Sequence, residues 1–168
     1  MIILKKLNPN KDISKKYFNW MNSKEIQRYT EQRHKKHSMR DIKAFVKAKN
    51  LSTTEFLYGI FLKKKNVNDH IGNIKLGPID LIHKTADISY FIGEKELWGK
   101  NYTTLAIKEI IKIAKKKKIK KIQAGFHELN KGSKKVLKKN GFKLEGKLNS
   151  SITYKNKRYS AYIMGLIL

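Results

Sequence analysis

The turn between an apolar run and a long amphipathic run, at residues 96–101, is the feature that most constrains this chain. The apolar run at 85–93 (TADISYFIG) predicts a strand, and the wide apolar stripe of residues 104–116 predicts a helix. The first backbone N–H groups of a helix have no internal partner, the helix dipole adds positive potential there, and Gly99 lets a ligand approach the backbone closely. The junction therefore predicts an anion site, with a plain strand-to-helix connection as the alternative.

The rest of the chain alternates strand-like and helix-like segments without a repeat or a Pro/Gly/Ser linker. Asp12 is expected to start the first helix, Ser38 and Asp41 to cap the second, Asn130 to cap the last and Gly141 to end it. The order β-α-α-β-β-β-α-β-α-β-β predicts an α+β fold, a single domain over residues 1–168 with helices packed on a mixed sheet. Strands are predicted at 1–7, 55–64, 70–79, 85–93, 118–126, 142–154 and 158–168, and helices at 12–23, 38–49, 104–116 and 130–140.

Basic residues far outnumber acidic ones, with 39 Lys and Arg against 13 Asp and Glu and a formal net charge of +26. Such a charge favours nucleic acid as a partner. The excess is nevertheless spread along the whole chain, consists mostly of Lys, and comes without the aromatic-and-glycine pattern of RNA-binding modules or the spacing of zinc fingers. We therefore interpret the charge mainly as solvated faces that also attract an anionic ligand, and keep a non-catalytic nucleic-acid-binding module as the alternative.

Disulfides, metal sites and membrane segments leave no trace in the sequence. The chain has no Cys, which excludes disulfides and thiolate metal sites and suits a reducing compartment. His34 and His37 lie three residues apart without a carboxylate in a metal-ligand pattern, so no metal is expected. No apolar stretch reaches the roughly 18 residues that span a membrane, and the apolar run at the N-terminus is too short for a signal peptide. The expected location is the cytoplasm, without a membrane partner.

Five motifs occur in one order along the chain: IGNIKLGPI, ADISYFIG, WGKNYTTLA, NKGSKKVLKKNGFKLEG and YKNKRY. In this order and spacing they resemble the GNAT superfamily of acetyl-coenzyme-A-dependent N-acetyltransferases, and within it the branch of the ribosomal-protein N-terminal and amino-sugar acetyltransferases. The resemblance covers residues 1–168. It departs from the family pattern at Asn101, where Gly is usual, and at Thr103, where Ala or Gly is usual. Asn enters the left-handed conformation readily, so the turn stays compatible with the pattern.

The resemblance implies a sheet in which the strand ending at 90–93 splays away from the strand at 118–126, with acetyl-coenzyme A (acetyl-CoA) in the gap. The pyrophosphate is expected at the helix start that follows the turn. Backbone around Phe91 and Gly93 is expected to hold the pantetheine arm and to face the developing oxyanion. The implied contacts of acetyl-CoA are Phe91, Ile92, Gly93, Trp98, Gly99, Lys100, Asn101, Tyr102, Thr103, Thr104, Asn130 and Ser133.

Acetylation of an amine needs a proton acceptor for the amine and a proton donor for the departing thiolate. Asp87, at the acidic position of the family motif, and His127, near the end of the next strand, are the candidate bases, and either can instead be structural. Many members of the family carry the donor as a Tyr four residues before the Gly of the GF pair, where this chain has Leu137. Ser133 is expected to replace that Tyr, directly or through water, unless it only stabilises the first turn of its helix.

The resemblance also implies that the segment between the first two helices and the final hairpin shape the acceptor site. That segment, which includes residues 27–38, is strongly basic here. Arg33, Lys35 and Lys36 are expected to hold the phosphate of a small-molecule acceptor, such as an amino sugar or a sugar nucleotide. The alternative for the basic residues is a solvated, mobile loop, and the alternative acceptor is a protein N-terminus. A homodimer is compatible with the sequence.

Overall fold

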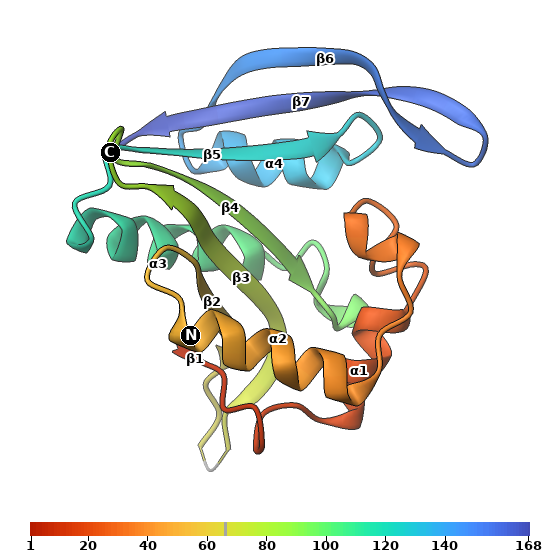
Figure 1. Cartoon of the computed structure of the whole chain (residues 1–168), viewed down its shortest axis with the longest axis vertical. Helices are drawn as coiled ribbons and strands as arrows, with labels where there is room; N and C mark the ends of the chain where they lie inside the picture. The colour runs from red at the N-terminus through yellow and green to blue at the C-terminus, as the bar shows by residue number, and fades with distance from the viewer. Residues whose placement is uncertain (66) are drawn as a thin grey trace.

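The computed structural model describes residues 1–65 and 67–168, and its elements follow the order expected from the sequence (Figure 1). Seven strands form one sheet in the spatial order β1-β2-β3-β4-β5-β7-β6. The strands are β1 (Ile2–Lys6), β2 (Phe56–Leu62), β3 (Asp69–Asp80), β4 (Thr85–Ile92), β5 (Lys121–His127), β6 (Lys143–Tyr154) and β7 (Lys157–Ile167). The helices are α1 (Lys15–Asn22), α2 (Met39–Leu51), α3 (Tyr102–Lys116) and α4 (Lys131–Lys139), with short 3-10 turns η1 (Glu31–His34) and η2 (Lys95–Leu97).

The sheet consists of two antiparallel parts that meet at one short parallel pairing. Strands β1 to β4 pair antiparallel in sequence order, and β7 pairs antiparallel with both β5 and β6. β4 pairs with β5 only from Thr85 to Asp87, opposite residues 121–123. Beyond Asp87 the two strands run apart, as Figure 1 shows from their common end near the C-terminus. The expected splay of the central strands is therefore confirmed. It opens a gap between β4 and β5 along the part of β4 that follows Asp87.

Helices cover both faces of the sheet because each has one apolar stripe. The main core lies against α3 and α4, where Ile107, Ile110 and Leu137 have no exposed surface. A second core lies against α1 and α2, where Trp20 and Val46 pack with side chains from β2. None of the helices within the described residues is long and apolar enough to span a membrane.

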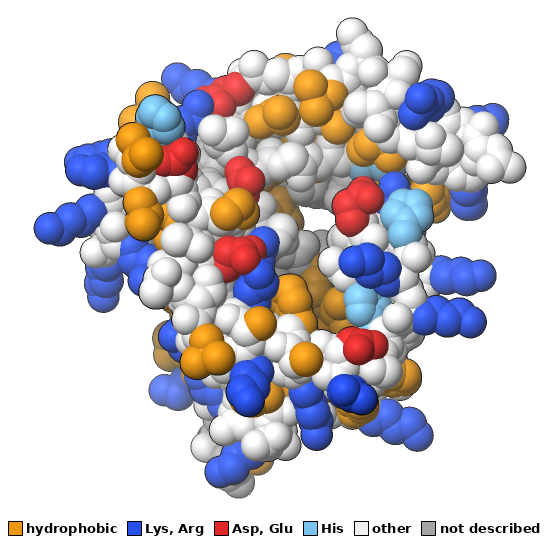
Figure 2. Space-filling model, in the orientation of Figure 1, with side chains coloured by type: hydrophobic (Ala, Val, Ile, Leu, Met, Phe, Trp, Pro, Cys, Tyr) orange, Lys and Arg blue, Asp and Glu red, His pale blue; other side chains and the backbone are white. Residues whose placement is uncertain are grey.

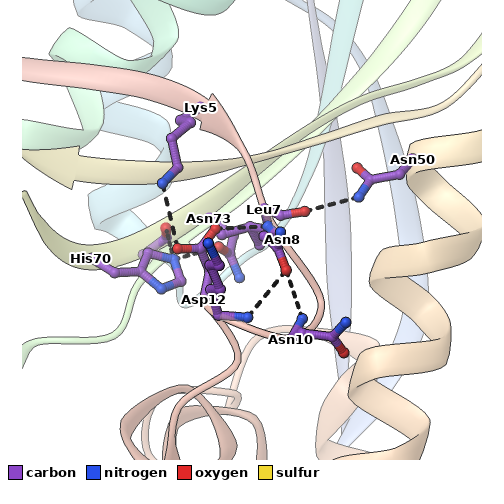
Figure 3. Close-up of polar contacts among 10 residues, drawn as sticks. Lys5, Leu7, Asn8, Asn10, Asp12, Asn50, His70 and Asn73 are labelled. Atoms are coloured by element: carbon purple, nitrogen blue, oxygen red, sulfur yellow. Dashed lines mark hydrogen bonds and ion pairs between the residues drawn. The ribbon is translucent and has the colours of Figure 1, made fainter.

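The first helix begins later than the sequence suggested, at a cap made by Ser14 and not by Asp12. Ser14 Oγ accepts the N–H of Tyr17 at 3.3 Å. The Asp12 carboxylate instead accepts the N–H of Asn8 at 2.7 Å and lies 3.4 Å from the Lys5 ammonium (Figure 3). The expected start at Asp12 was wrong because the β1–α1 turn uses that carboxylate to close on itself, which leaves the next hydroxyl to cap the helix.

Candidate active site

A cavity of about 500 Å³ lies where β4 separates from β5. Four segments line it: the connection from α1 to η1, the last residues of β4, the turn into α3 with its first residues, and α4 with the two residues before it. Figure 2 shows a hollow in the middle of the face that carries these segments. The separation of the two strands thus brings together residues that lie more than 100 positions apart in the chain.

The start of α3 presents backbone to this cavity. Asn101, the residue before the helix, has the left-handed conformation (φ 69°), and within the described residues its side chain makes no capping hydrogen bond. Gly99 has φ 75° and open space around it, and Trp98 Nε1 fixes the turn by donating to the Ile92 carbonyl at 2.9 Å. Thr104 is only 4% exposed, and its hydroxyl has no partner among the side chains and backbone that the structure describes. The helix start therefore offers unpaired donors to an anion.

Three lysines of α4 add positive charge to the same cavity. They are spaced by four residues, so they lie on one side of the helix. The sequence contained the signal, a Lys at every fourth position of a predicted helix. We had instead interpreted these lysines as part of a solvated face. The cavity-lining lysines are Lys131, Lys135 and Lys139.

Ser133 and Tyr90 meet across the cavity wall. The Ser133 hydroxyl lies 2.8 Å from the Tyr90 hydroxyl, one from α4 and the other from β4. Asn130 caps α4 as expected, since its side chain accepts the N–H of Ser133 at 3.0 Å. Leu137, at the position of the family's tyrosine, is fully buried in the main core. Burial raises the pKa of Tyr90 to about 12, so its hydroxyl keeps its proton.

Most of the residues expected to contact acetyl-CoA line the cavity, but Gly93 and Lys100 do not. Gly93 donates its N–H to the Ile71 carbonyl at 2.8 Å, so that N–H does not face the cavity. A side chain at Gly93 would also overlap the ring of Trp20, which gives this glycine a packing role. The expected residues that do line the cavity are Phe91, Ile92, Trp98, Gly99, Asn101, Tyr102, Thr103, Thr104, Asn130 and Ser133.

The two candidate bases lie outside the cavity lining. Asp87 is exposed on β4, in the short stretch where β4 still pairs with β5. His127 is 2% exposed, and its Nδ1 accepts the N–H of Leu129 at 3.1 Å, so the neutral ring carries its proton on Nε2. Burial lowers the pKa of His127, and the charge of Arg33 lowers it further. Three aromatic rings surround the imidazole, those of Tyr29, Tyr154 and Tyr159.

The basic loop at residues 27–38 is held by hydrogen bonds and an ion pair among its own residues. Thr30 caps η1, and Arg33 donates to the Thr30 carbonyl at 2.9 Å and pairs with Glu31 at 3.3 Å. The side chain of Arg33 is therefore turned into the loop, whereas Lys35 and Lys36 are exposed. None of the three lines the cavity as the structure describes it.

Two charged residues from the connection after α1 do line the cavity: Arg28, which belongs to the basic segment expected to shape the acceptor site, and Glu25, which was not predicted. The Arg28 guanidinium lies 4.9 Å from the ring centre of Tyr29 and 5.6 Å from that of Trp98. Glu25 is ion-paired with Lys95 and is the one carboxylate among the described residues that line the cavity. The basic composition of residues 27–38 pointed to the segment that contains Arg28, whereas no local signal set Glu25 apart.

Within residues 1–65 and 67–168, no cluster of three or more His, Cys, Asp or Glu side chains is arranged to hold a metal ion. The polar groups that the described residues present to the cavity are helix-start N–H groups, hydroxyls, lysines, Arg28 and Glu25.

Comparison with known proteins gives one family and one fold. The family model for the acetyltransferase (GNAT) domain matches residues 2–143. No curated protein matches the sequence.

Solved structures match the chain over nearly its whole length. The microcin self-immunity acetyltransferase MccE, in complex with acetyl-CoA and AMP, is 21% identical with a TM-score of 0.82, and the match covers 99% of this chain and 92% of that one. RimL, a ribosomal α-N-protein acetyltransferase in complex with coenzyme A, is 17% identical with a TM-score of 0.87, covering 99% and 94%. Spermidine N-acetyltransferase from Vibrio cholerae, in complex with coenzyme A and spermine, is 18% identical with a TM-score of 0.87, covering 99% and 95%. The same fold thus occurs in proteins named for different acceptors.

Proposed function

Since the chain belongs to the acetyltransferase (GNAT) domain family, we propose that it transfers the acetyl group of acetyl-CoA to a primary amine of a small phosphate-bearing molecule, such as an amino sugar linked to a nucleotide. Membership of the family makes it an acyltransferase. The proposal treats residues 1–168 as one catalytic domain that acts in the cytoplasm.

The start of α3 is the observation that carries the proposal. Its N–H groups lack a capping side chain among the described residues, Thr104 adds an unpartnered hydroxyl, and three lysines of α4 face the same cavity. A pyrophosphate and a further phosphate, both parts of coenzyme A, suit this set of donors and charges. The residues present therefore fit the co-substrate that the family uses.

The acceptor side of the cavity has one carboxylate and one guanidinium. Glu25 suits the ammonium form of the acceptor and can take the proton that the amine must lose before it attacks. Arg28, held over Trp98, suits a phosphate that the reaction does not touch. A polyamine has no phosphate for Arg28, and the complex of the related MccE fold with AMP is in keeping with a nucleotide-bearing acceptor.

The chemical step depends mainly on positioning, because amine and thioester must meet in one cleft. Acetyl-CoA supplies the activated acetyl group when it is bound. Ser133 supplies a hydroxyl that lines the cavity, and we assign to it the hydrogen bond that the departing sulfur needs. His127 and Asp87 lie outside the cavity lining, so we assign proton removal to Glu25 ahead of them.

Two measurements test the proposal. Acetyl-CoA should raise the Tm of the protein, whereas ATP should do so far less, because ATP lacks the pantetheine arm that fills the splay. Thiol release in the presence of acetyl-CoA should then rise with a nucleotide-linked amino sugar and stay at background with its N-acetylated form. Thiol release with a peptide N-terminus and none with the sugar nucleotide would contradict the proposed acceptor but would still agree with an acetyltransferase.

Variants of Arg28 test the phosphate contact with matched controls. Arg28→Gln should raise the KM for the phosphate-bearing acceptor about tenfold and leave the KM for acetyl-CoA nearly unchanged. Arg28→Lys should raise this KM less than Arg28→Gln does, since lysine keeps the positive charge but lacks the two fixed donors of a guanidinium. Lys36→Gln, which removes an exposed charge outside the cavity, should have little effect. Equal effects of Arg28→Gln and Lys36→Gln would overturn the role of Arg28.

A further inference from the structure

The pair of hydroxyls from Tyr90 and Ser133 carries an inference about how the leaving group is handled. We infer that Tyr90 is a positioning residue: its hydroxyl donates to Ser133 Oγ and thereby frees the serine hydrogen to point at the sulfur that departs. The inference rests on the proposed function and adds a residue from β4 to it. Its basis is the 2.8 Å contact between two hydroxyls that both belong to residues lining the cavity.

The direction of the hydrogen bond follows from the chemistry of the two groups. A phenol is a better donor than an aliphatic hydroxyl, and Tyr90 keeps its proton because its pKa lies near 12. Ser133 Oγ has two lone pairs and one hydrogen. When Oγ accepts from Tyr90, its own hydrogen is left for another acceptor. The backbone of Ser133 is held at the same time, since Asn130 accepts its N–H.

The place of Ser133 on α4 suits this role. Leu137 stands where many members of the family have a tyrosine, and it is fully buried without a proton to offer. Ser133 lies four residues earlier, so it occupies the same side of the helix one turn closer to the cavity. A serine hydroxyl is shorter than a tyrosine and free to rotate, so it needs a fixed partner to aim it. Tyr90 is such a partner, from a strand that the main core holds in place.

The pair stabilises the leaving group without giving up its own protons. In the reaction a C–N bond forms, the C–S bond breaks, and the bonding electron pair goes to sulfur, while the proton of the amine passes to a base. A thiol has a pKa of about 8.5, far below that of Tyr90, so the thiolate does not take the tyrosine proton. Solvent supplies the proton that a released thiol carries at neutral pH. What the pair contributes is an oriented hydrogen bond to a negative sulfur.

Binding of coenzyme A itself, compared with desulfo-coenzyme A, tests the inference without an acceptor. The desulfo compound lacks only the sulfur, so the ratio of the two Kd values from calorimetry isolates the environment of that atom. In the native protein coenzyme A should gain over the desulfo compound as the pH rises from 6 to 9, because the site favours the thiolate. In Tyr90→Phe the affinity advantage of coenzyme A over the desulfo compound at high pH should be about three- to tenfold smaller than in the native protein. A change of this size is expected from the loss of one charge-assisted hydrogen bond. Ser133→Ala should remove at least as much, and the double variant no more than Ser133→Ala.

Two controls separate this role from a structural one. Tyr58→Phe also removes the hydroxyl of a partly buried tyrosine, but on β2 and outside the cavity lining, and it should leave the pH dependence of the ratio as in the native protein. The Tm of each variant shows whether the fold is kept. A native ratio in Tyr90→Phe, or a loss in the double variant that equals the sum of the single losses, would overturn the inference. Failure of the native protein to bind either compound would instead overturn the proposed function.

Discussion

At the start of α2 the Ser38 side chain accepts the N–H of Asp41 at 3.1 Å and the Asp41 carboxylate accepts the N–H of Ser38 at 3.0 Å, whereas at the start of α3 the Asn101 side chain caps nothing that the structure describes. The α3 helix is the longer of the two, with 15 residues against 13, and its apolar stripe is the more deeply buried. A cap would have stabilised it in the same way. The burial of Ala106, Ile107 and Ile110 in the main core instead supplies most of the stability of α3.

The difference separates two uses of one physical feature. The first N–H groups of any helix need partners. At α2 the side chains of Ser38 and Asp41 bond to the N–H groups of Asp41 and Ser38, so this helix start contributes to the stability of the protein. At α3 the first residues of the helix line a cavity together with lysines of α4, so in the proposed function coenzyme A provides the partners of these N–H groups. A substitution at α2 should therefore change stability, and a substitution at α3 should change binding.

The largest effect should follow from Asn101→Pro at α3. Proline fixes φ near −65°, whereas Asn101 has φ 69°, so the substitution must change the path of the backbone into the helix. Losing two charge-assisted hydrogen bonds to the phosphates should weaken coenzyme A binding by at least about a hundredfold, as measured by calorimetry. Asn101→Gly, which tolerates the same φ, is the control and should bind as the native protein does. If the proline variant binds coenzyme A with native affinity, the start of α3 is not part of the binding site.

Thr103→Asp should have a smaller effect, raising the stability of the protein and lowering its affinity for coenzyme A. A carboxylate in the first turn interacts favourably with the helix dipole, so the free energy of unfolding should rise by about 0.3 to 1 kcal/mol. The same charge repels a phosphate, and coenzyme A binding should fall about tenfold or more. The neutral Thr103→Asn variant should show neither change at that size. Thermal unfolding and calorimetry together check both signs, and a carboxylate that leaves affinity unchanged would contradict the assignment of an anion to this helix start.

At α2, Ser38→Ala should act on stability alone. Loss of the cap should lower the free energy of unfolding by about 1 kcal/mol, which for a chain of this length corresponds to a fall in Tm of roughly 2 to 4 °C. The affinity for coenzyme A should stay within twofold of the native value, because α2 contributes nothing to the cavity lining that the structure describes. Ser38→Thr keeps a hydroxyl and should retain most of the stability. A fall in affinity with Ser38→Ala would erase the distinction between the two helix starts.

The smallest effect is the pH dependence of the α2 cap. Hydrogen bonds from the side chain and backbone of Ser38 hold the pKa of Asp41 below its ordinary value of 3.8. A depressed pKa in the folded state means that the contribution of Asp41 is complete above about pH 4 and is lost as the pH falls through the folded value. The Tm difference between the native protein and Asp41→Asn should therefore be constant from pH 7 to pH 5 and shrink toward pH 2. A difference that grows on acidification would contradict the sign.

Much of this contrast could be predicted from the sequence. Ser38 and Asp41 lie three residues apart before an apolar stripe, and the structure has the capping box that this spacing indicates. Asn101 in the left-handed turn and Asn130 at the start of α4 were predicted in the same way. The start of α1 was misplaced, because two residues competed for one role. Both Asp12 and Ser14 can cap a helix, and the hydrogen bond from the Asn8 N–H to Asp12 decides between them (Figure 3).

The functional groups of the cavity were harder to predict, because their meaning depends on distant partners. Arg33 belongs to a basic run, yet its guanidinium is bound within its own loop. Arg28, in the same basic segment, lines the cavity, and so does Glu25, which precedes the segment and belongs to no motif. His127 has a side chain suited to base catalysis, but burial among aromatic rings leaves its Nδ1 occupied by a backbone N–H.

The sequence by itself determined the order of the elements and the capping residues of α2 and α4, and it led us to predict an anion site before α3. These features follow from hydrophobic periodicity and from hydrogen bonds between residues at most four positions apart, so a short window of sequence contains them. Tertiary structure alone decided that Tyr90 meets Ser133, 43 residues away, and that Arg28 lies over Trp98. β4 and β5 stop pairing after three residues, which leaves Tyr90 beyond the paired stretch and open to contact with α4. Both contacts join segments that are distant in the chain, so no local pattern encodes them.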